Sequence, residues 1–219
     1  MILTKKEITS RLHTQQIVFT PNLDEFQLQP SSVDLRLGWS FYTPITWKYN
    51  ELGRIALNAD YLNYQKIEEY FKLIKLNPGQ YYEILPNEFI IVSTLEKITL
   101  NCGDLVGTLY PRSSAIRRGL QIQAGVVDCY YDGQLTVPVV NTSNHIIKLY
   151  PGERIVQLQF STLASELTRE EAQMHGRQTA KYSGSTPYGL EAKTDNNEEL
   201  DLIKLGKIDE LKNNFKLNN

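Results

Sequence analysis

The feature that most constrains the fold of this chain is a succession of short β-rich runs separated by turn residues. Several such runs follow one another between Gly79 and Tyr110, and Pro86-Asn87 and Asn101-Cys102-Gly103-Asp104 supply turn chemistry between them. Residues 121–160 add further strands of similar length. Many short strands at turn-like intervals favour an antiparallel barrel or sandwich over alternating βαβ units. We therefore predict an all-β core.

An earlier strand is predicted in the segment of residues 29–38, where residues 33–37 alternate. Apolar residues alternate there with Asp34 and Arg36, which is the period of a half-buried strand. The two charged side chains then share one face. A surface ion pair between them, with a free energy of about 0 to 1 kcal/mol, is the simpler interpretation.

Residues 46–76 have a different pattern, which predicts an inserted amphipathic helix. Apolar residues recur there at spacings of three and four with charged residues between them. Packing on the core or on a neighbouring subunit accounts for these residues better than a catalytic role does. The residues on the apolar face are Tyr61, Tyr64, Ile67, Phe71 and Ile74.

The end of the chain predicts a helical extension. Leu205, Ile208, Leu211 and Phe215 lie at helical spacing around Gly206, and a glycine inside a helix costs about 1 kcal/mol. We expect one domain over 1–190 and a C-terminal helical extension over 191–219, which docks in a groove of the core or on an adjacent subunit.

Composition limits the function and the compartment. The chain has 23 Lys and Arg against 25 Asp and Glu, so its overall charge does not attract a nucleic acid polymer, and anion binding must come from local arginines. Cys102 and Cys129 lie far apart, which argues against a disulfide framework and a structural zinc site. No apolar run is long enough for a membrane span, and the first residues do not look like a signal peptide. We expect a cytoplasmic protein.

Residues 111–120 form a small-residue turn with three arginines, a composition that hydrophobic burial does not explain. Arg112, Arg117 and Arg118 surround the hydroxyls of Ser113 and Ser114. The segment is suited to holding phosphate. A solvated basic face is the common alternative for the Arg117-Arg118 pair alone.

Residues 124–133 form a hairpin-like segment in which Asp128 follows an apolar run and precedes two aromatic rings. Asp128 is our candidate for chemistry, although a carboxylate beside such a turn more often caps the turn. Residues 181–189 are rich in glycine and hydroxyl groups and contain one lysine. That run can wrap a phosphate through its backbone amides, or it can be a flexible linker.

Five motifs follow one another along the chain. They are Ser31 to Gly38, Arg112-Ser113-Ser114 with Arg117 and Gly119, Val127-Asp128 with Gly133, Asn141, and Gly152-Glu153-Arg154 with Gln157. In this order they resemble the dCTP deaminase and dUTP diphosphatase superfamily. The resemblance implies a distorted β-barrel or jelly-roll-like subunit, a homotrimer with active sites at the subunit interfaces, and Mg²⁺ carried on the nucleotide triphosphate.

The branch of the superfamily is the harder question. In the deaminase branch a glutamate in the strand before Asn141 shuttles protons, but the matching residue here is Pro138, and residues 134–140 contain no carboxylate. Residues 124–133 are similar to the diphosphatase motif. We therefore expect a dUTP diphosphatase that forms dUMP and pyrophosphate. The alternatives are a dCTP deaminase, including a bifunctional dUMP-forming one, and a nucleotide-binding regulatory protein without turnover.

The resemblance also implies a role for each site residue. Asp128 would activate the water, and arginines would absorb the charge of the triphosphate. Tyr131 would exclude a ribose 2′-hydroxyl, and Gly125 would let the backbone approach the uracil edge. Asp34 would support the site at a distance. The expected substrate-binding residues are Arg112, Ser113, Ser114, Arg117, Gly125, Tyr131, Gln157, Lys181 and Tyr182.

Overall fold

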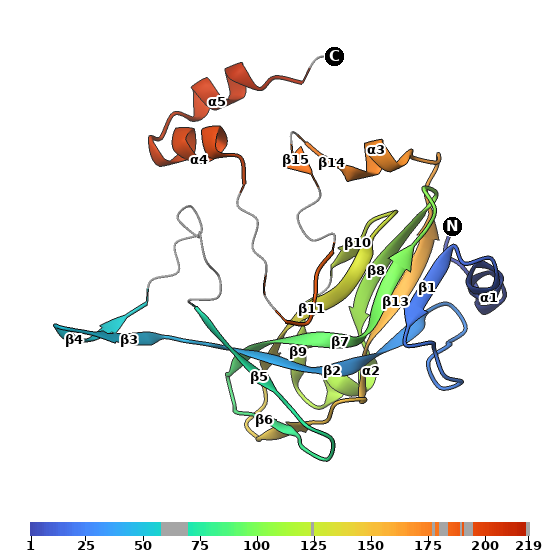
Figure 1. Cartoon of the computed structure of the whole chain (residues 1–219), viewed down its shortest axis with the longest axis horizontal. Coiled ribbons are helices and arrows are strands. Elements are labelled where there is room, and N and C mark those ends of the chain that lie inside the picture. The colour runs from blue at the N-terminus through green and yellow to red at the C-terminus, as the bar shows by residue number, and fades with distance from the viewer. Residues whose placement is uncertain are drawn as a thin grey trace.

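The computed structural model describes residues 1–57, 70–123, 125–176, 184–188, 190 and 195–217, and the backbone of 178–179. Most of these residues lie in strands (Figure 1). The strands are β1 Ile17–Thr20, β2 Val33–Pro44, β3 Trp47–Asn50, β4 Gly53–Ala56, β5 Phe71–Lys75, β6 Tyr82–Ile84, β7 Phe89–Leu100, β8 Leu105–Pro111, β9 Leu120–Ile122, β10 Val126–Val127, β11 Asp132–Asn141, β12 Ile147–Leu149, β13 Arg154–Thr162, β14 Met174–His175 and β15 Gln178–Thr179. The helices are α1 Lys5–His13, α2 Ser113–Arg117, α3 Arg169–Gln173, α4 Asn197–Lys204 and α5 Ile208–Asn214.

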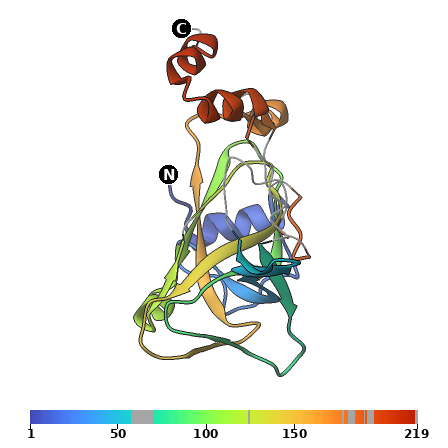
Figure 2. The same ribbon diagram turned by 90° about the vertical axis from the view of Figure 1, so that its left-hand side faces the viewer.

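One large antiparallel sheet forms the body of the molecule. Its strand order is β10-β8-β13-β2-β7-β11-β9, with β1 added to β7 and β5 added to β2. The sheet curls round so that its two ends approach each other (Figures 1 and 2). The prediction of an all-β, barrel-like core is confirmed.

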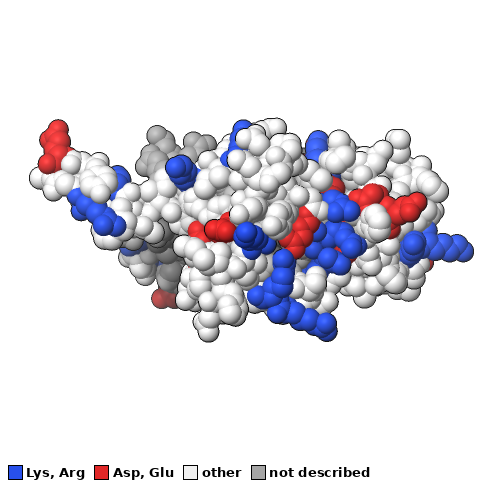
Figure 3. Space-filling view, turned by 90° about the horizontal axis from the view of Figure 1, so that it is seen from below, with Lys and Arg blue, Asp and Glu red and all other residues white. Residues whose placement is uncertain are grey.

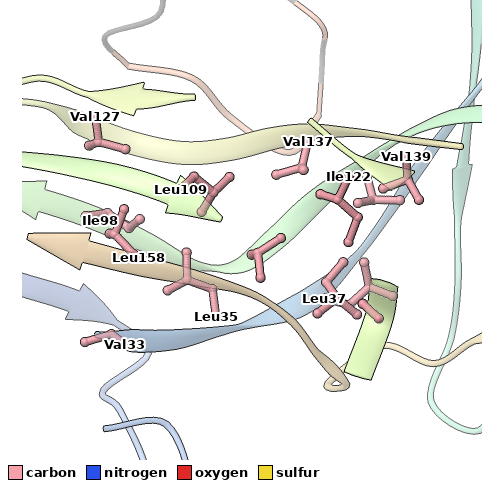
Figure 4. Packing of buried hydrophobic residues seen from close by; sticks show 14 of the residues in the cluster. Val33, Leu35, Leu37, Ile98, Leu109, Ile122, Val127, Val137, Val139 and Leu158 are labelled. Atoms are coloured by element: carbon pink, nitrogen blue, oxygen red, sulfur yellow. The ribbon is translucent and has the colours of Figure 1, made fainter. Parts of the chain in front are cut away.

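The core lies inside this curl. Val33, Leu35 and Leu37 of β2 are fully buried, and so are Leu158 and Phe160 of β13. Val33, Leu35, Leu37 and Leu158 point to the same interior (Figure 4), as the period of a strand with one buried face requires. The alternation across 33–37 therefore predicted β2 correctly.

Close backbone packing occurs where β2 crosses β7. The register between these strands shifts between Leu37 and Phe41. A Cβ atom at Gly38 would lie 2.5 Å from Ser93 Oγ and 2.6 Å from the Thr94 carbonyl oxygen. The absence of a side chain at Gly38 lets the two longest strands approach each other.

We expect Gly38→Ala to lower the free energy of unfolding by about 3 kcal/mol, because the extra methyl overpacks the β2–β7 crossing. The matched control is Gly125→Ala, since a Cβ there would meet no described atom within 4 Å. Urea denaturation of both variants measures the difference. Equal stability of the two variants would show that the crossing adapts to a side chain.

The predicted helix over 46–76 is wrong for the residues that the structure describes. Residues 47–56 form the β3–β4 hairpin, and β5 pairs with β2, with Ile74 opposite Phe41 and Phe71 opposite Pro44. Spacings of three and four also occur by chance in a strand, and the ladder of backbone hydrogen bonds to β2 decides the outcome here. Tyr61, Tyr64 and Ile67 lie outside the described residues.

The end of the chain is helical, as its spacing predicts, but it forms two helices. Gly206 adopts φ +69°, a conformation that favours glycine and ends α4. Leu200 is buried, whereas Leu205 and Ile208 are exposed. Figures 1 and 2 show α4 and α5 standing apart from the large sheet, so the described helices do not occupy a groove of the core. The domain boundary at 190 stays a prediction.

No helix among the described residues has the length and apolarity needed to cross a membrane.

Candidate active site

A buried carboxylate joins three strands of the sheet below the arginine loop. Asp34 of β2 is 2% exposed. Its Oδ2 atom forms an ion pair with Arg112 Nε at 2.9 Å and accepts a hydrogen bond from Arg154 Nη1 at 3.2 Å. Arg112 also donates to the Arg154 carbonyl oxygen at 2.9 Å. The cluster of Asp34, Arg112 and Arg154 therefore connects the end of β8 to β2 and β13.

Electrostatics at Asp34 are a balance of opposing effects. Burial raises the pKa of Asp34, and the positive charges of Arg112, Arg154 and Arg36 oppose that rise. The predicted surface ion pair between Asp34 and Arg36 is wrong. Arg36 instead binds Asp24, at 2.8 Å from Nη2 to Oδ2, because the larger sheet places other guanidinium groups over Asp34.

A second buried carboxylate, Glu96 of β7, has a structural role. Its Oε1 accepts from Gln27 Nε2 at 2.7 Å, and its Oε2 accepts from the Arg36 backbone N–H at 3.0 Å. Gln27 also donates to the Asp34 carbonyl oxygen. Burial raises the pKa of Glu96. The Glu96 side chain thus accepts the β2 backbone hydrogen bond of Arg36 in place of a backbone carbonyl of β7.

The arginine loop forms helix α2, which follows β8 directly. Ser113, Ser114 and Arg117 are exposed on it. Arg118 forms an ion pair with Glu153, but Arg117 has no ion pair among the described residues. Figure 3 shows basic and acidic side chains gathered on the underside of the molecule. Of the three arginines, Arg117 alone has a guanidinium that no described carboxylate occupies.

Asn141 fixes the neighbouring loop. Its side chain is fully buried and donates from Nδ2 to the carbonyl oxygens of Ile84 at 3.0 Å and His145 at 2.7 Å. Its Oδ1 accepts from the Ser143 N–H at 2.9 Å. Thr142 in turn donates its N–H to the Gly119 carbonyl oxygen at the end of the arginine loop. Asn141 therefore positions α2 through the backbone.

Asp128 follows β10, which pairs with the end of β8 that lies away from the arginine loop. β10 pairs with β8, with Val127 opposite Gly107, so Asp128 continues this register to a place beside Val106. The six residue-to-residue steps from Val106 to Arg112 span about 20 Å of extended chain. Asp128 is 51% exposed. A single chain therefore does not bring Asp128 to the arginine loop.

Tyr131 folds back over its own hairpin. Its hydroxyl donates to the Gln134 carbonyl oxygen at 3.1 Å, and burial raises its pKa to about 12. A Cβ atom at Gly133 would lie 2.9 Å from this hydroxyl oxygen and 3.0 Å from the Ser185 nitrogen. Gly133 is thus the position that lets the ring and the later segment approach the hairpin.

The segment around Ser185 reaches the hairpin of its own chain. Gly184 donates its N–H to the Asp132 carbonyl oxygen at 2.7 Å, and Gln134 donates to the Ser185 carbonyl oxygen at 3.0 Å. Tyr42 donates from its hydroxyl to the Pro187 carbonyl oxygen at 2.9 Å. Lys181 and Tyr182, just before this segment, lie outside the described residues.

Two further predicted site residues are open to their surroundings. Gly125 is exposed, and a Cβ there would meet nothing within 4 Å. Gln157 lies on β13 between Asp34 of β2 and Tyr110 of β8, and its side chain has no hydrogen bond to a described residue. The Gly125 carbonyl oxygen accepts from the Leu109 N–H at 2.8 Å, so of these two residues only Gln157 has a side-chain amide without a described partner.

Pro138 lies on the half-exposed face of β11, opposite the buried Val137 and Val139. Its carbonyl oxygen accepts from the Gln123 N–H, so its ring nitrogen faces the side on which β9 ends. A missing N–H is tolerated at such a place. The nearest carboxylate of β11, Asp132, is held by Thr99 Oγ1 at 2.6 Å and Lys97 Nζ at 2.8 Å.

Comparisons with known proteins decide the family. A family model described as dCTP deaminase-like matches residues 2–163. The chain therefore belongs to the dCTP deaminase-like family. This finding confirms the superfamily that the five motifs predicted.

The relatives of this dCTP deaminase-like protein carry a more specific name. "dCTP deaminase, dUMP-forming" of Methanosphaera stadtmanae is 33% identical over 94% of this chain and 99% of its own length. The protein of the same name from Dictyoglomus turgidum is 36% identical over 75% of this chain and 82% of its own. These names overturn the expected assignment as a dUTP diphosphatase.

A solved structure shares the fold. The 2′-deoxycytidine 5′-triphosphate deaminase from Agrobacterium tumefaciens superposes with a TM-score of 0.56 at 21% identity, over 73% of this chain and 48% of that one. The dCTP deaminase-like protein thus spans about half the length of that structure. The likeness concerns the fold.

The wrong assignment has an identifiable cause. It weighted the resemblance of residues 124–133 to a diphosphatase motif, a local match around Asp128, above the rest of the chain. The comparison with the Methanosphaera stadtmanae protein covers almost the whole of both chains and is the stronger indication. A local motif shows which chemistry is compatible with one hairpin, but not which branch the whole domain follows.

Sequence reasoning did not single out two residues that the structure brings next to predicted site residues. Arg154 appeared only as part of a motif, yet it shares Asp34 with Arg112. A charged residue at an alternating position of a predicted strand was the available signal for it. His175 lies 3.7 Å from Asp128 across a turn between distant segments, and no local pattern indicates that contact.

Proposed function

We propose that this protein is a dCTP deaminase of the dUMP-forming kind. In that reaction water replaces the exocyclic amine of the cytosine, which leaves as ammonia, and a second water releases pyrophosphate to give dUMP. The observation that carries the proposal is the identity of 33% across 99% of a relative with that name. The substrate is a pyrimidine deoxynucleoside triphosphate and not a nucleic acid polymer.

The guanidinium of Arg117, which pairs with no described carboxylate, supports a role in triphosphate binding. Arg117 is exposed and has no ion pair among the described residues, and the hydroxyls of Ser113 and Ser114 lie on the same short helix. A guanidinium and hydroxyl groups suit the oxygens of a triphosphate. Arg112 contributes indirectly, because its guanidinium already binds Asp34.

Mg²⁺ is proposed as a partner of the nucleotide. The described residues contain no cluster of three or more His, Cys, Asp or Glu side chains placed to hold a metal ion. Triphosphate oxygens are hard ligands of the kind that Mg²⁺ prefers, so the ion would be held mainly by the substrate. Bound there, it would neutralise negative charge on the phosphates.

A homotrimer with shared sites is proposed from the separation of the site residues. Asp128 lies about 20 Å along β8 from Arg112 within one chain, so one site needs the hairpin and the arginine loop of different copies. The candidates for the hairpin side are Asp128, Gly125 and Tyr131, with Lys181 and Tyr182 following. Gln157 belongs to the arginine side, because it pairs with Asp34. The two free cysteines suit a cytoplasmic location.

A second candidate function is a nucleotide-binding regulatory protein that does not deaminate. Pro138 favours it, because the resemblance places the proton-shuttling glutamate of the deaminases at this position and proline has no group that transfers a proton. Binding residues such as Arg117 are unaffected by this difference. The two candidates share the ligand and differ in turnover.

One assay separates the candidates. The full-length protein is incubated with dCTP and MgCl₂, and ammonia, pyrophosphate, dUTP and dUMP are quantified beside a calorimetric binding measurement. Ammonia and dUMP formation supports the deaminase. Binding of dCTP without ammonia release overturns it and supports the regulatory protein, and failure to bind dCTP contradicts both.

A further inference from the structure

An aspartate and a histidine from distant parts of the chain meet at the Asp128 turn. His175 Nε2 lies 3.7 Å from Asp128 Oδ2, and the two side chains are 43% and 51% exposed. His175 is on β14, more than 40 residues later in the sequence. Both side chains are therefore accessible to solvent, and both come from the same chain.

The segment that brings His175 there is anchored beside the pair. Thr168 and Glu171 form a capping box at the start of α3, with Thr168 N–H donating to Glu171 Oε2 at 2.7 Å. Leu167 donates its N–H to the Gly103 carbonyl oxygen at 2.9 Å and accepts the Tyr130 hydroxyl at 3.4 Å. These contacts fix the approach of α3 and β14 to the turn.

The charged residues near Asp128 and His175 have other partners. Arg169 lies over the Tyr130 ring at 5.1 Å from its centroid, and Asp104, whose charge acts on Cys129, forms an ion pair with Arg11. Burial, followed by the charge of Asp128, raises the pKa of the intervening Cys129. No described residue donates a hydrogen bond to either Asp128 carboxylate oxygen. Asp128 thus has His175 on one oxygen and an open second oxygen.

We propose that His175 is a positioning residue for Asp128 and accepts the proton of the water that releases pyrophosphate. This inference rests on the proposed function. The water oxygen forms a bond to the α-phosphorus while the bond from that phosphorus to the α,β-bridging oxygen breaks, and pyrophosphate leaves with the electron pair. The water proton passes to the Asp128 carboxylate. From its Oδ2 side the proton passes to His175 Nε2 once the 3.7 Å separation closes to hydrogen-bonding distance, and His175 returns it to solvent.

The test is His175→Asn with dCTP as substrate and with His13→Asn as the matched control, because His13 is an exposed histidine at the end of α1. We expect pyrophosphate release to slow by about 10²-fold, the usual size of a proton-transfer contribution. Ammonia release stays unchanged, so dUTP accumulates in place of dUMP. The value of kcat for pyrophosphate release falls, while KM for dCTP stays that of the wild type.

Other outcomes overturn the inference. Unchanged pyrophosphate release excludes the role, and an equal loss of ammonia and pyrophosphate assigns His175 to folding or binding instead. If the wild type forms no ammonia from dCTP, the proposed function fails separately. In that case the NMR signals of the His175 ring decide the contact itself: Asp128→Asn shifts them while the His13 signals stay, and an unshifted His175 signal overturns the pairing.

Discussion

Replacing Arg112 by alanine lowers the free energy of unfolding by about 3 kcal/mol in our expectation, which is the lower end of the range for breaking a buried ion pair. Asp34 is 2% exposed and loses the closer of its two guanidinium partners, while Arg154 stays at 3.2 Å. A buried carboxylate with an incomplete set of partners is costly because water does not replace the missing donor. Urea denaturation measures the change.

Arg118→Ala is the matched control for Arg112→Ala. Arg118 binds Glu153 at the surface, where such a pair contributes about 0 to 1 kcal/mol. Arg117→Ala should show the opposite behaviour to Arg112→Ala. Its stability stays near that of the wild type, and its affinity for dCTP falls by about 10-fold or more, since a charge-assisted hydrogen bond is lost. If Arg112→Ala and Arg118→Ala have the same urea midpoint of unfolding, the Asp34 cluster does not have the proposed stabilising role.

Pro138→Glu is expected to raise ammonia release from dCTP by about 10²-fold, because a positioned general acid and base contributes at least that much. Position 138 is half-exposed on the face of β11 that does not join the core, so a longer polar side chain fits without unpacking it. The substitution also restores a backbone N–H at the point where β9 ends. Ammonia is measured in a coupled assay at saturating dCTP.

Pro138→Gln distinguishes the effect of a proton-transferring group from the effect of side-chain size. Glutamine has nearly the same size and restores the same N–H, but it does not carry a proton to the base. Only Pro138→Glu should gain activity. If both variants deaminate at the rate of the wild type, this protein uses a different group for proton transfer and the proline is not the reason for a lower rate.

We expect the effects of Pro138→Glu and Arg112→Ala to be independent. Pro138→Glu acts on the cytosine ring, whereas Arg112→Ala acts on the support of the arginine loop. A double variant should therefore combine a higher rate per folded molecule with the lower stability of Arg112→Ala, since distant changes without shared partners add. The described contacts show no residue shared by Pro138 and the Asp34 cluster.

The sequence alone determined the kind of core and the superfamily. Alternation across 33–37 and the turn residues between the later runs depend only on the two-residue period of a strand, which local sequence expresses directly. The family motifs also keep their order along the chain, so they are legible without a structure. The exposure of Arg117 was also predictable, because small residues and adjacent charges indicate a surface segment, although the segment forms the short helix α2 and not a turn.

Only the tertiary structure decided which charges meet. Asp34 binds Arg112 and Arg154 instead of Arg36, since three strands distant in sequence become neighbours in the sheet. Residues 71–75 form a strand for the same reason, because β2 offers backbone partners that outweigh a short helical spacing. His175 reaches Asp128 through the packing of α3. Contacts between distant segments depend on sheet order and register, and a local pattern contains neither.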